Sequence, residues 1–181
     1  MKVIETGLEG CLLIEPNVFR DTRGFFLELY HENKYAEIGI KEKFVQDNRS
    51  RSVKNVLRGL HFQINKPQGK LVTVTAGEVF DVALDLRRNS NTFGQYYSVI
   101  LSSENNYQLY IPPGFAHGFC VLSEIADFQY KCTSFYDPKD EGGIIWNDKE
   151  LNINWPTENP IVSEKDDKLI TFSEYKTRVP E

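Results

Sequence analysis

The chain has 181 residues, 40% hydrophobic and 13% aromatic, which predicts a strand-rich globular protein and excludes a disordered chain. A net charge of −5 without a basic run argues against a nucleic acid polymer as partner. Cys11, Cys120 and Cys132 are far apart and form no CxxC motif, so they predict neither a disulfide framework nor a zinc ribbon and favour a reducing cytoplasm.

Neither a membrane segment nor a division into domains is visible in the sequence. No apolar run approaches the roughly 20 residues of a membrane helix, and residues 1–16 lack a signal-peptide pattern. No repeat or Pro/Gly/Ser linker interrupts the chain. We therefore expect a single domain over residues 1–181, without membrane contact.

The first third of the chain alternates short apolar stretches with turn-like sequences. These patterns predict strands over 10–19, 25–30 and 56–63, a turn at 20–24, a short helix over 32–40 that ends near Gly39, and extended chain or loop over 44–52.

Residues 70–87 carry the strongest strand signal. Apolar and polar residues alternate from Leu71, the pattern breaks at 76–78 as a hairpin turn would, and alternation then resumes. Asp81 and Asp85 occupy alternate positions in the second half. Such a spacing indicates either a solvated face or a polar cavity.

The remaining sequence predicts more strands and few helices. We expect strands over 95–102, 106–112, 119–123 and 126–136, a turn at 112–118 and a short helix within 163–176. Short strands at close spacing, separated by polar turns, indicate a sandwich or barrel. The expected fold is mainly β: a double-stranded β-helix (a cupin jelly roll) with short helices and a C-terminal extension.

The stretch VLRGLHFQ, residues 56–63, places His61 in an apolar strand. Small barrels of the cupin type often bind a metal through an HxH pair, a later Glu and a further His after a Pro–Gly turn. Here His117 follows such a turn, but Gln63 replaces the second His of the pair, and the cation Lys70 stands where a carboxylate is needed. Because a metal requires several converging ligands, we expect no metal.

A lone histidine on an apolar strand is most often a hydrogen-bonded core residue, but this one has charged neighbours. Arg58 and Lys70 flank it, and Asp81 and Asp85 are equal candidates to orient it. Imidazole, cations and carboxylates around one cavity suit proton transfer on an anionic substrate. His61 is therefore a candidate base.

Strict alternation would put Arg58 and His61 on opposite faces of the strand. Gly59 lies between them, and a glycine inside a strand often marks a bulge. We predict a bulge or kink at Gly59 that turns both side chains toward one cavity.

Seven motifs, in order, resemble the dTDP-4-dehydrorhamnose 3,5-epimerase family of cupin-fold sugar-nucleotide epimerases. The likeness extends from about Ile14 to Asp166. The motifs are DTRGFFLE, FVQDNRSRS, VLRGLHFQ, QGKLVTVTAGEVFDVALDLRRNSNTFG, IPPGFAHGFCVLSE, YKCTSFYDPKDEGGIIWND and SEKD. The resemblance implies a metal-free, cofactor-independent homodimer in which each active site includes residues of the partner subunit.

The resemblance also implies a role for each matching residue. His61 matches the base, Asp166 the carboxylate that orients it, Tyr130 the acid across the sugar ring and Lys70 the cation beside the ketone oxygen. The implied substrate contacts are Arg58 and His117 near the diphosphate and sugar, Arg23, Phe25, Glu28, Gln46 and Asn48 near the nucleotide, and Tyr136 and Glu141.

Without the resemblance, each of these residues has an ordinary structural interpretation. Asp166 lies in a charged run, Tyr130 is one of nine tyrosines, and Lys70 is a loop cation. Arg23 and Glu28 would form a surface pair of little energetic weight. The joint presence of the four catalytic matches argues against a purely structural set.

The implied activity is that of an isomerase, an epimerase that inverts C3 and/or C5 of a nucleotide-diphosphate 4-keto-6-deoxy sugar. The favoured reaction converts dTDP-4-keto-6-deoxy-glucose to dTDP-4-keto-rhamnose, in carbohydrate biosynthesis for capsule or lipopolysaccharide. Three alternatives stay open: a 3- or 3,5-epimerase acting on a GDP-4-keto-6-deoxy-heptose of capsule biosynthesis, a non-catalytic sugar-binding jelly roll, and a metal-dependent cupin oxygenase.

Overall fold

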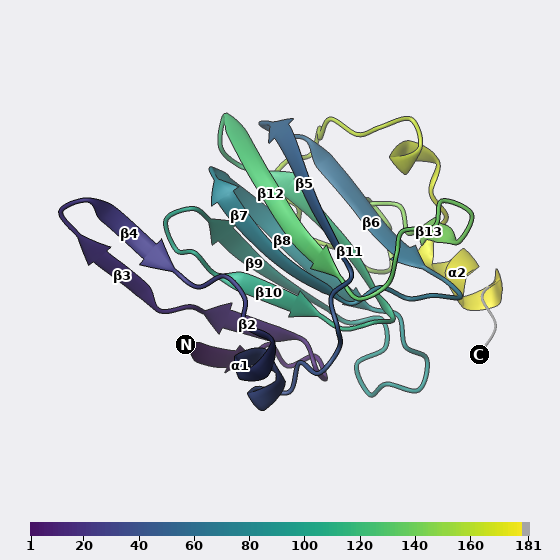
Figure 1. The fold of residues 1–181 in the computed structure, drawn as a ribbon. Coiled ribbons are helices and arrows are strands. Elements are labelled where there is room, and N and C mark those ends of the chain that lie inside the picture. The colour runs from purple at the N-terminus through teal and green to yellow at the C-terminus, as the bar shows by residue number, and fades with distance from the viewer. Residues whose placement is uncertain (179–181) are drawn as a thin grey trace.

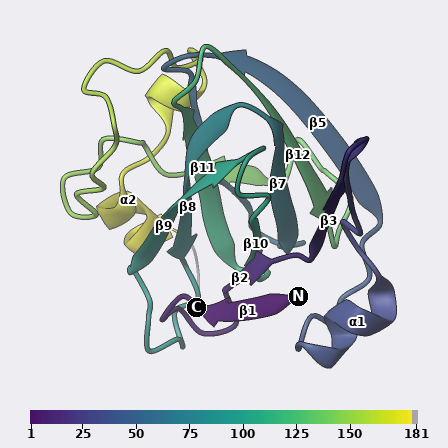
Figure 2. The same ribbon diagram turned by 90° about the vertical axis from the view of Figure 1, so that its left-hand side faces the viewer.

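The computed structural model describes residues 1–178, in which two curved sheets enclose a common interior (Figures 1 and 2). All paired strands run antiparallel. The expected cupin jelly roll is confirmed.

The six-stranded sheet contains, in spatial order, β1 (Lys2–Glu5), β2 (Leu12–Glu15), β10 (Gln108–Ile111), β7 (Lys70–Ala76), β12 (Ile125–Cys132) and β5 (Gln46–Val53). The five-stranded sheet contains β13 (Glu141–Gly143), β6 (Leu57–Gln63), β11 (Phe115–Val121), β8 (Glu78–Asp85) and β9 (Tyr96–Ser102). The strands β3 (Val18–Asp21) and β4 (Gly24–Leu27) form a separate hairpin that projects from the body of the protein (Figure 1).

Inward-facing side chains of both sheets form the main core. Val72 and Phe128 of the six-stranded sheet pack in one cluster with Val79, Ala83 and Phe119 of the five-stranded sheet. These residues fill the closed part of the barrel, so polar side chains facing the same interior are held in surroundings of low dielectric constant.

The C-terminal segment covers the outer face of the five-stranded sheet. It contains a 3₁₀ turn, η1 (Asp166–Lys168), and the helix α2 (Phe172–Arg178). Phe172 and Tyr175 of α2 pack in a second cluster with Val82 and Leu84 of β8. β8 is therefore buried on both faces, and its alternating Asp residues face an interior, not solvent.

The prediction of a hairpin turn at 76–78 is wrong. β7 pairs with β10 and β12, whereas β8 pairs with β9 and β11, so the chain crosses from one sheet to the other at Gly77. Gly77 has φ +76°, and an added Cβ would lie 2.1 Å from the Ile125 carbonyl oxygen. Only glycine fits this crossing without displacing β12.

Three further segments differ from expectation. The strand predicted over 10–19 is divided at Pro16 into β2 and β3, because proline provides no N–H for a ladder. The turn predicted over 112–118 ends at Gly114, and His117 lies within β11. Residues 44–52, expected to be extended chain or loop, mostly belong to β5.

The predicted helices are confirmed in α1 (Glu32–Glu37), which precedes Gly39 at φ +99°, and in α2. Within residues 1–178, no helix is both long enough and apolar enough to cross a membrane.

Candidate active site

A bulge in β6 shapes the mouth of the barrel. His61 pairs with His117 and Arg58 pairs with Phe119, so two residues of β6 stand opposite the single Gly118. Gly59 has φ +111°, and an added Cβ would lie 2.6 Å from the Gly118 Cα. The predicted bulge at Gly59 is confirmed, and the close approach of the two strands explains why this position requires glycine.

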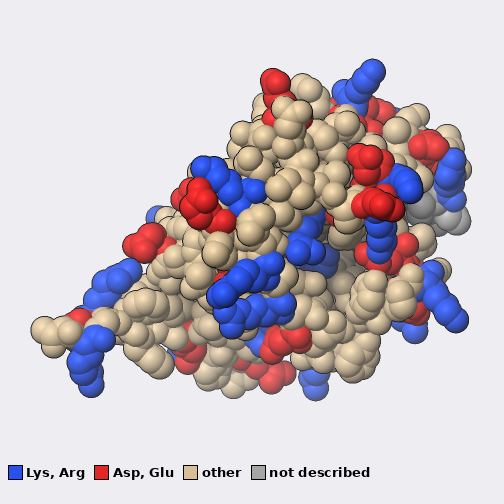
Figure 3. All heavy atoms as spheres, turned by 90° about the horizontal axis from the view of Figure 1, so that it is seen from above, with Lys and Arg blue, Asp and Glu red and all other residues tan. Residues whose placement is uncertain are grey.

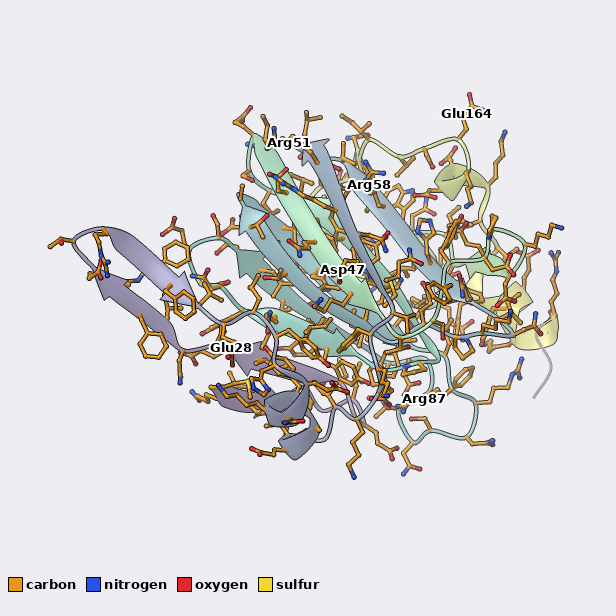
Figure 4. All side chains as sticks on the ribbon, in the orientation of Figure 1. Glu28, Asp47, Arg51, Arg58, Arg87 and Glu164 are labelled. Atoms are coloured by element: carbon orange, nitrogen blue, oxygen red, sulfur yellow. The ribbon has the colours of Figure 1, made fainter. Side chains whose placement is uncertain are left out.

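The bulge lets Arg58 reach across to the neighbouring sheet. Its Nε donates to the Ser52 hydroxyl of β5 at 3.1 Å, and Figure 4 shows Arg58 between β5 and β6. The guanidinium also acts electrostatically on Tyr130, which faces the same interior. Seen from above, Lys and Arg side chains lie beside a hollow in this face of the protein, and Asp and Glu side chains share its rim (Figure 3).

His61 and Asp166 form a hydrogen-bonded pair. The His61 Nε2 lies 2.8 Å from Asp166 Oδ1, and the Gly59 N–H donates to Asp166 Oδ2 at 3.2 Å. Asp166 is 4% exposed, so the solvated interpretation of its charged run is wrong. Burial would raise the pKa of Asp166, but the hydrogen bonds from His61 and Gly59 outweigh it and leave the pKa below its ordinary value.

The segment that carries Asp166 is pinned at both ends. Ile161 forms a bridge with Val56, and Ile170 forms a bridge with Ile144. Between these anchors, the Asp166 N–H donates to the Ser163 hydroxyl at 3.1 Å. The carboxylate is thus held beside His61 by backbone contacts as well as by its own side chain.

Glu141 links this segment to the rim of the barrel. Its carboxylate forms an ion pair with Lys165 and accepts a hydrogen bond from the Tyr136 hydroxyl at 2.6 Å. These two interactions lower the pKa of Glu141, against the effect of its partial burial. Tyr136 also donates its backbone N–H to the Gln46 side chain at 2.9 Å.

A second histidine–aspartate pair lies deeper in the barrel. His117 Nε2 is 2.9 Å from Asp81 Oδ2, and its ring stacks on Phe128. Burial lowers the pKa of His117, and the nearby Asp81 only partly opposes this effect. Asp81 therefore orients His117, not His61 as the spacing allowed, and Asp85 binds Arg87 at the far end of β8.

The opposite wall consists of aligned residues on β5, β12 and β7. Gln46 pairs with Cys132, which pairs with Lys70, and the neighbouring row joins Asn48 to Tyr130. Because directly opposed residues of antiparallel strands share a face, all five side chains point into the same interior. The Gln46 amide donates to Asn48 Oδ1 at 3.0 Å, which fixes the edge of this wall.

Burial perturbs the two candidate proton-handling groups on this wall. It lowers the pKa of the Lys70 ammonium. It raises the pKa of the Tyr130 phenol, with the Arg58 charge acting in the opposite direction. Both shifts arise because a charged group is disfavoured in a dry interior.

The described residues provide no cluster of three or more His, Cys, Asp or Glu side chains able to hold a metal. His61 and His117 each use one ring nitrogen on a carboxylate, and the Lys70 cation lies among them. These residues can transfer protons and stabilise negative charge without a metal ligand set.

Three predicted substrate contacts do not meet this cavity within one chain. Arg23 pairs with Asp21 of the projecting hairpin at 2.5 Å, and Glu28 pairs with Lys34 at 2.7 Å. Figure 4 shows Glu28 at the base of the hairpin, on the other side of the protein from Arg58. Phe25 is 55% exposed.

Three comparisons relate the chain to known proteins. The model of the dTDP-4-dehydrorhamnose 3,5-epimerase family matches residues 5–174. The chain belongs to this family. A member from Salmonella typhimurium is 56% identical over 169 residues, covering 92% of each chain.

Two solved structures of family members have the same fold as this chain. That of the Elizabethkingia anophelis enzyme has a TM-score of 0.92 at 50% identity and covers 96% of this chain and 97% of its own. A Legionella pneumophila dTDP-6-deoxy-D-glucose-3,5-epimerase in complex with dTDP-4-keto-L-rhamnose has a TM-score of 0.91 at 52% identity, with coverages of 94% and 92%.

The sequence of this family member does not reveal the roles of two residues of the site. It offers Asp81 only as a partner for His61, although the place of Asp81 on a strand with apolar neighbours indicates a cavity. The one signal for Lys165 is its position next to Asp166. Both acquire their roles through contacts with residues distant in sequence.

Proposed function

We propose that the protein inverts C3 and C5 of dTDP-4-keto-6-deoxy-glucose to form dTDP-4-keto-L-rhamnose. The observation that carries this proposal is the His61–Asp166 pair facing a common interior with Lys70 and Tyr130. Membership of the family and the ligand of the Legionella relative support the substrate.

The first step removes a proton next to the C4 ketone. His61 donates its Nε2–H to Asp166, which leaves Nδ1 as the acceptor for the C5 or C3 proton. The carboxylate stabilises the imidazolium that forms, as in a catalytic triad. The electron pair of the broken C–H bond moves to the ketone oxygen, giving an enolate.

The enolate oxygen needs a positive group in a dry site, and Lys70 fits this task. The residue is 9% exposed and lies on the wall of the interior. Loss of such a donor typically costs about 3–4 kcal/mol of transition-state stabilisation.

Inversion requires a proton on the opposite face of the ring. Tyr130 donates its phenolic proton to the enolate carbon as the C4 carbonyl re-forms. The raised pKa of Tyr130 keeps this group protonated until the strongly basic carbon is generated. The imidazolium then returns its proton to solvent, and the phenolate recovers one, so that no proton is gained or lost overall.

We also propose that the active protein is a homodimer in which the β3–β4 hairpin of one subunit completes the site of the other. Support comes from the exposure of Phe19, Phe25 and Phe26 and from the separation of Arg23 and Glu28 from the cavity. Arg23 would meet the nucleotide beside Gln46, and Phe25 would lie under the base or sugar. The three free, buried cysteines fit a reducing compartment, which supports a cytoplasmic location.

The test is incubation with dTDP- and GDP-linked 4-keto-6-deoxy sugars in deuterated water, followed by NMR. We expect deuterium at both C3 and C5 of the dTDP sugar and appearance of the rhamno product. Exchange with the GDP sugar alone would favour the heptose alternative, and saturable binding without exchange would favour the sugar-binding jelly roll. Either result would overturn the proposal.

A further inference from the structure

Asp81 is a buried carboxylate in which only one of the two oxygens has a hydrogen-bond partner within the described chain. It is 0% exposed, and its Oδ2 accepts from His117 at 2.9 Å. Its Oδ1 is also buried and has no hydrogen-bond partner among residues 1–178. A carboxylate oxygen in such a position is costly unless an opposite charge or a polar group compensates for the lost water.

His117 does not neutralise this carboxylate. Burial lowers the pKa of His117, so the imidazole is neutral at physiological pH and donates a hydrogen without carrying a charge. The negative charge of Asp81 therefore requires another partner.

Lys70 is a cation that lacks a partner of opposite charge among the described residues. The residue is 9% exposed, and its ammonium forms no hydrogen bond or ion pair with any residue in the described part of the chain. Burial lowers the pKa of Lys70, while Cys132, Asp81 and Glu141 act in the opposite direction. A cation that must stabilise an enolate needs one of these groups to hold its charge.

Two of these three groups cannot be the counter-ion of Lys70, Cys132 because of its burial and Glu141 because of its contacts. Burial raises the pKa of Cys132, so at neutral pH it is an uncharged thiol. Glu141 is neutralised by Lys165 and hydrogen-bonded by Tyr136. Asp81 alone retains a free oxygen and an uncompensated charge.

Strand alternation points Asp81 and Lys70 into the same space. Asp81 lies between Val79 and Ala83 on β8, and both of these belong to the interior cluster. Lys70 precedes Val72 by two residues on β7, and Val72 belongs to the same cluster. The two side chains thus face one interior without a direct hydrogen bond or ion pair, and the Asp81 charge acts electrostatically on the Lys70 ammonium. Opposed polar groups that do not touch directly are commonly linked through an ordered water.

We propose that Asp81 is a positioning residue shared by His117 and Lys70: Oδ2 takes the imidazole N–H, and Oδ1 holds the Lys70 ammonium through one bridging water, so that Lys70 meets the substrate charged. Only the catalytic consequence of this role rests on the proposed function. The counter-ion itself is a property of the free protein.

Asp81→Asn tests the role, with Asp85→Asn as the matched control. Both residues are fully buried aspartates on β8, but Asp85 binds Arg87, Ser90 and Thr92. Titration of the ¹⁵N-labelled lysine side chains by NMR, with Lys70 assigned through Lys70→Arg, should show its titration moved down by about 1–3 pH units in Asp81→Asn. It should be unmoved in Asp85→Asn.

The pH profile of deuterium exchange provides the second readout. In Asp81→Asn the alkaline limb of kcat should move to lower pH by a similar amount, with activity recovering as the pH is lowered. A purely structural defect would reduce kcat at every pH. An unchanged Lys70 titration in Asp81→Asn would overturn the proposal, whatever the activity.

Two further outcomes separate this proposal from the proposed function. A shifted Lys70 titration in a protein whose wild type shows no exchange would support the counter-ion and overturn the epimerase activity. If Asp81→Asn does not fold, Asp81→Ser replaces it. The titration of Lys70 in the wild type is a further test: a Lys70 side chain that is already neutral at pH 7.5 would overturn the proposal.

Discussion

The two histidine–aspartate pairs of this protein have nearly the same geometry and different surroundings. The ring nitrogen to carboxylate distances are 2.8 Å for His61–Asp166 and 2.9 Å for His117–Asp81. The His61 side chain is 29% exposed, whereas that of His117 is 7% exposed and stacks on Phe128. Asp166 begins the C-terminal 3₁₀ turn η1, and Asp81 lies on the central strand β8.

This difference indicates that the burial of the histidine, more than its hydrogen bond to the carboxylate, decides whether such a pair can transfer protons. His61 can exchange protons with a ligand and with solvent, as a base must. His117 is disfavoured as a cation by its burial, which suits a fixed neutral donor or acceptor. The same two side chains are therefore suited to proton transfer in one place and to positioning in the other.

The largest expected effect separates the two histidines directly. His61→Asn should lower deuterium exchange at C3 and C5 by about 10²–10⁴-fold, because it removes the base. His117→Gln, which keeps a donor for Asp81, should lower it by no more than about 10-fold. Initial exchange rates by NMR, with circular dichroism to show an intact fold, provide the measurement. Equal losses in the two variants would contradict the assignment of the base.

A smaller effect tests whether Tyr130, and not His117, returns the proton. Tyr130→Phe should slow formation of the inverted product by on the order of 10²-fold, while exchange without inversion continues through His61. The ratio of exchanged substrate to inverted product, followed by NMR, reports this partition. If the ratio matches that of the wild type, the acid lies elsewhere, and His117 becomes the next candidate.

The smallest effect is on stability. The pKa of His117 in the folded state lies below its unfolded value of about 6.5, so its contribution is present above that pH and is lost as the pH falls. Between pH 7.5 and 5.5 the wild type should lose about 2–4 °C more in Tm than His117→Gln. Carboxylates such as Asp166 act at lower pH and do not contribute to this window.

Thermal denaturation at the two pH values measures the difference, with His31→Gln as the control because His31 lies on the surface. The control should follow the wild type. A His117→Gln variant that loses as much Tm as the wild type would show that His117 is not the buried neutral group described above.

Much of the fold followed from local pattern. Alternation predicted β7 and β8, the glycine between Arg58 and His61 predicted the bulge in β6, and Gly39 predicted the end of α1. The prediction of a hairpin between β7 and β8 was wrong. A break in alternation indicates a turn of the chain, but it does not indicate whether the next strand joins the same sheet. The substrate contacts on the β3–β4 hairpin stay predictions, since they depend on a second subunit.

The sequence by itself determined the strand periodicity, the family and the identity of His61, Lys70 and Tyr130 as candidates, because these depend on residue type and order. Only the tertiary structure decided which carboxylate serves which histidine. Asp166 is 105 residues from His61, and Asp81 is 36 residues from His117. Periodicity reports which face of a strand is buried, but the partner across that face is set by sheet register and by the path of the C-terminal segment.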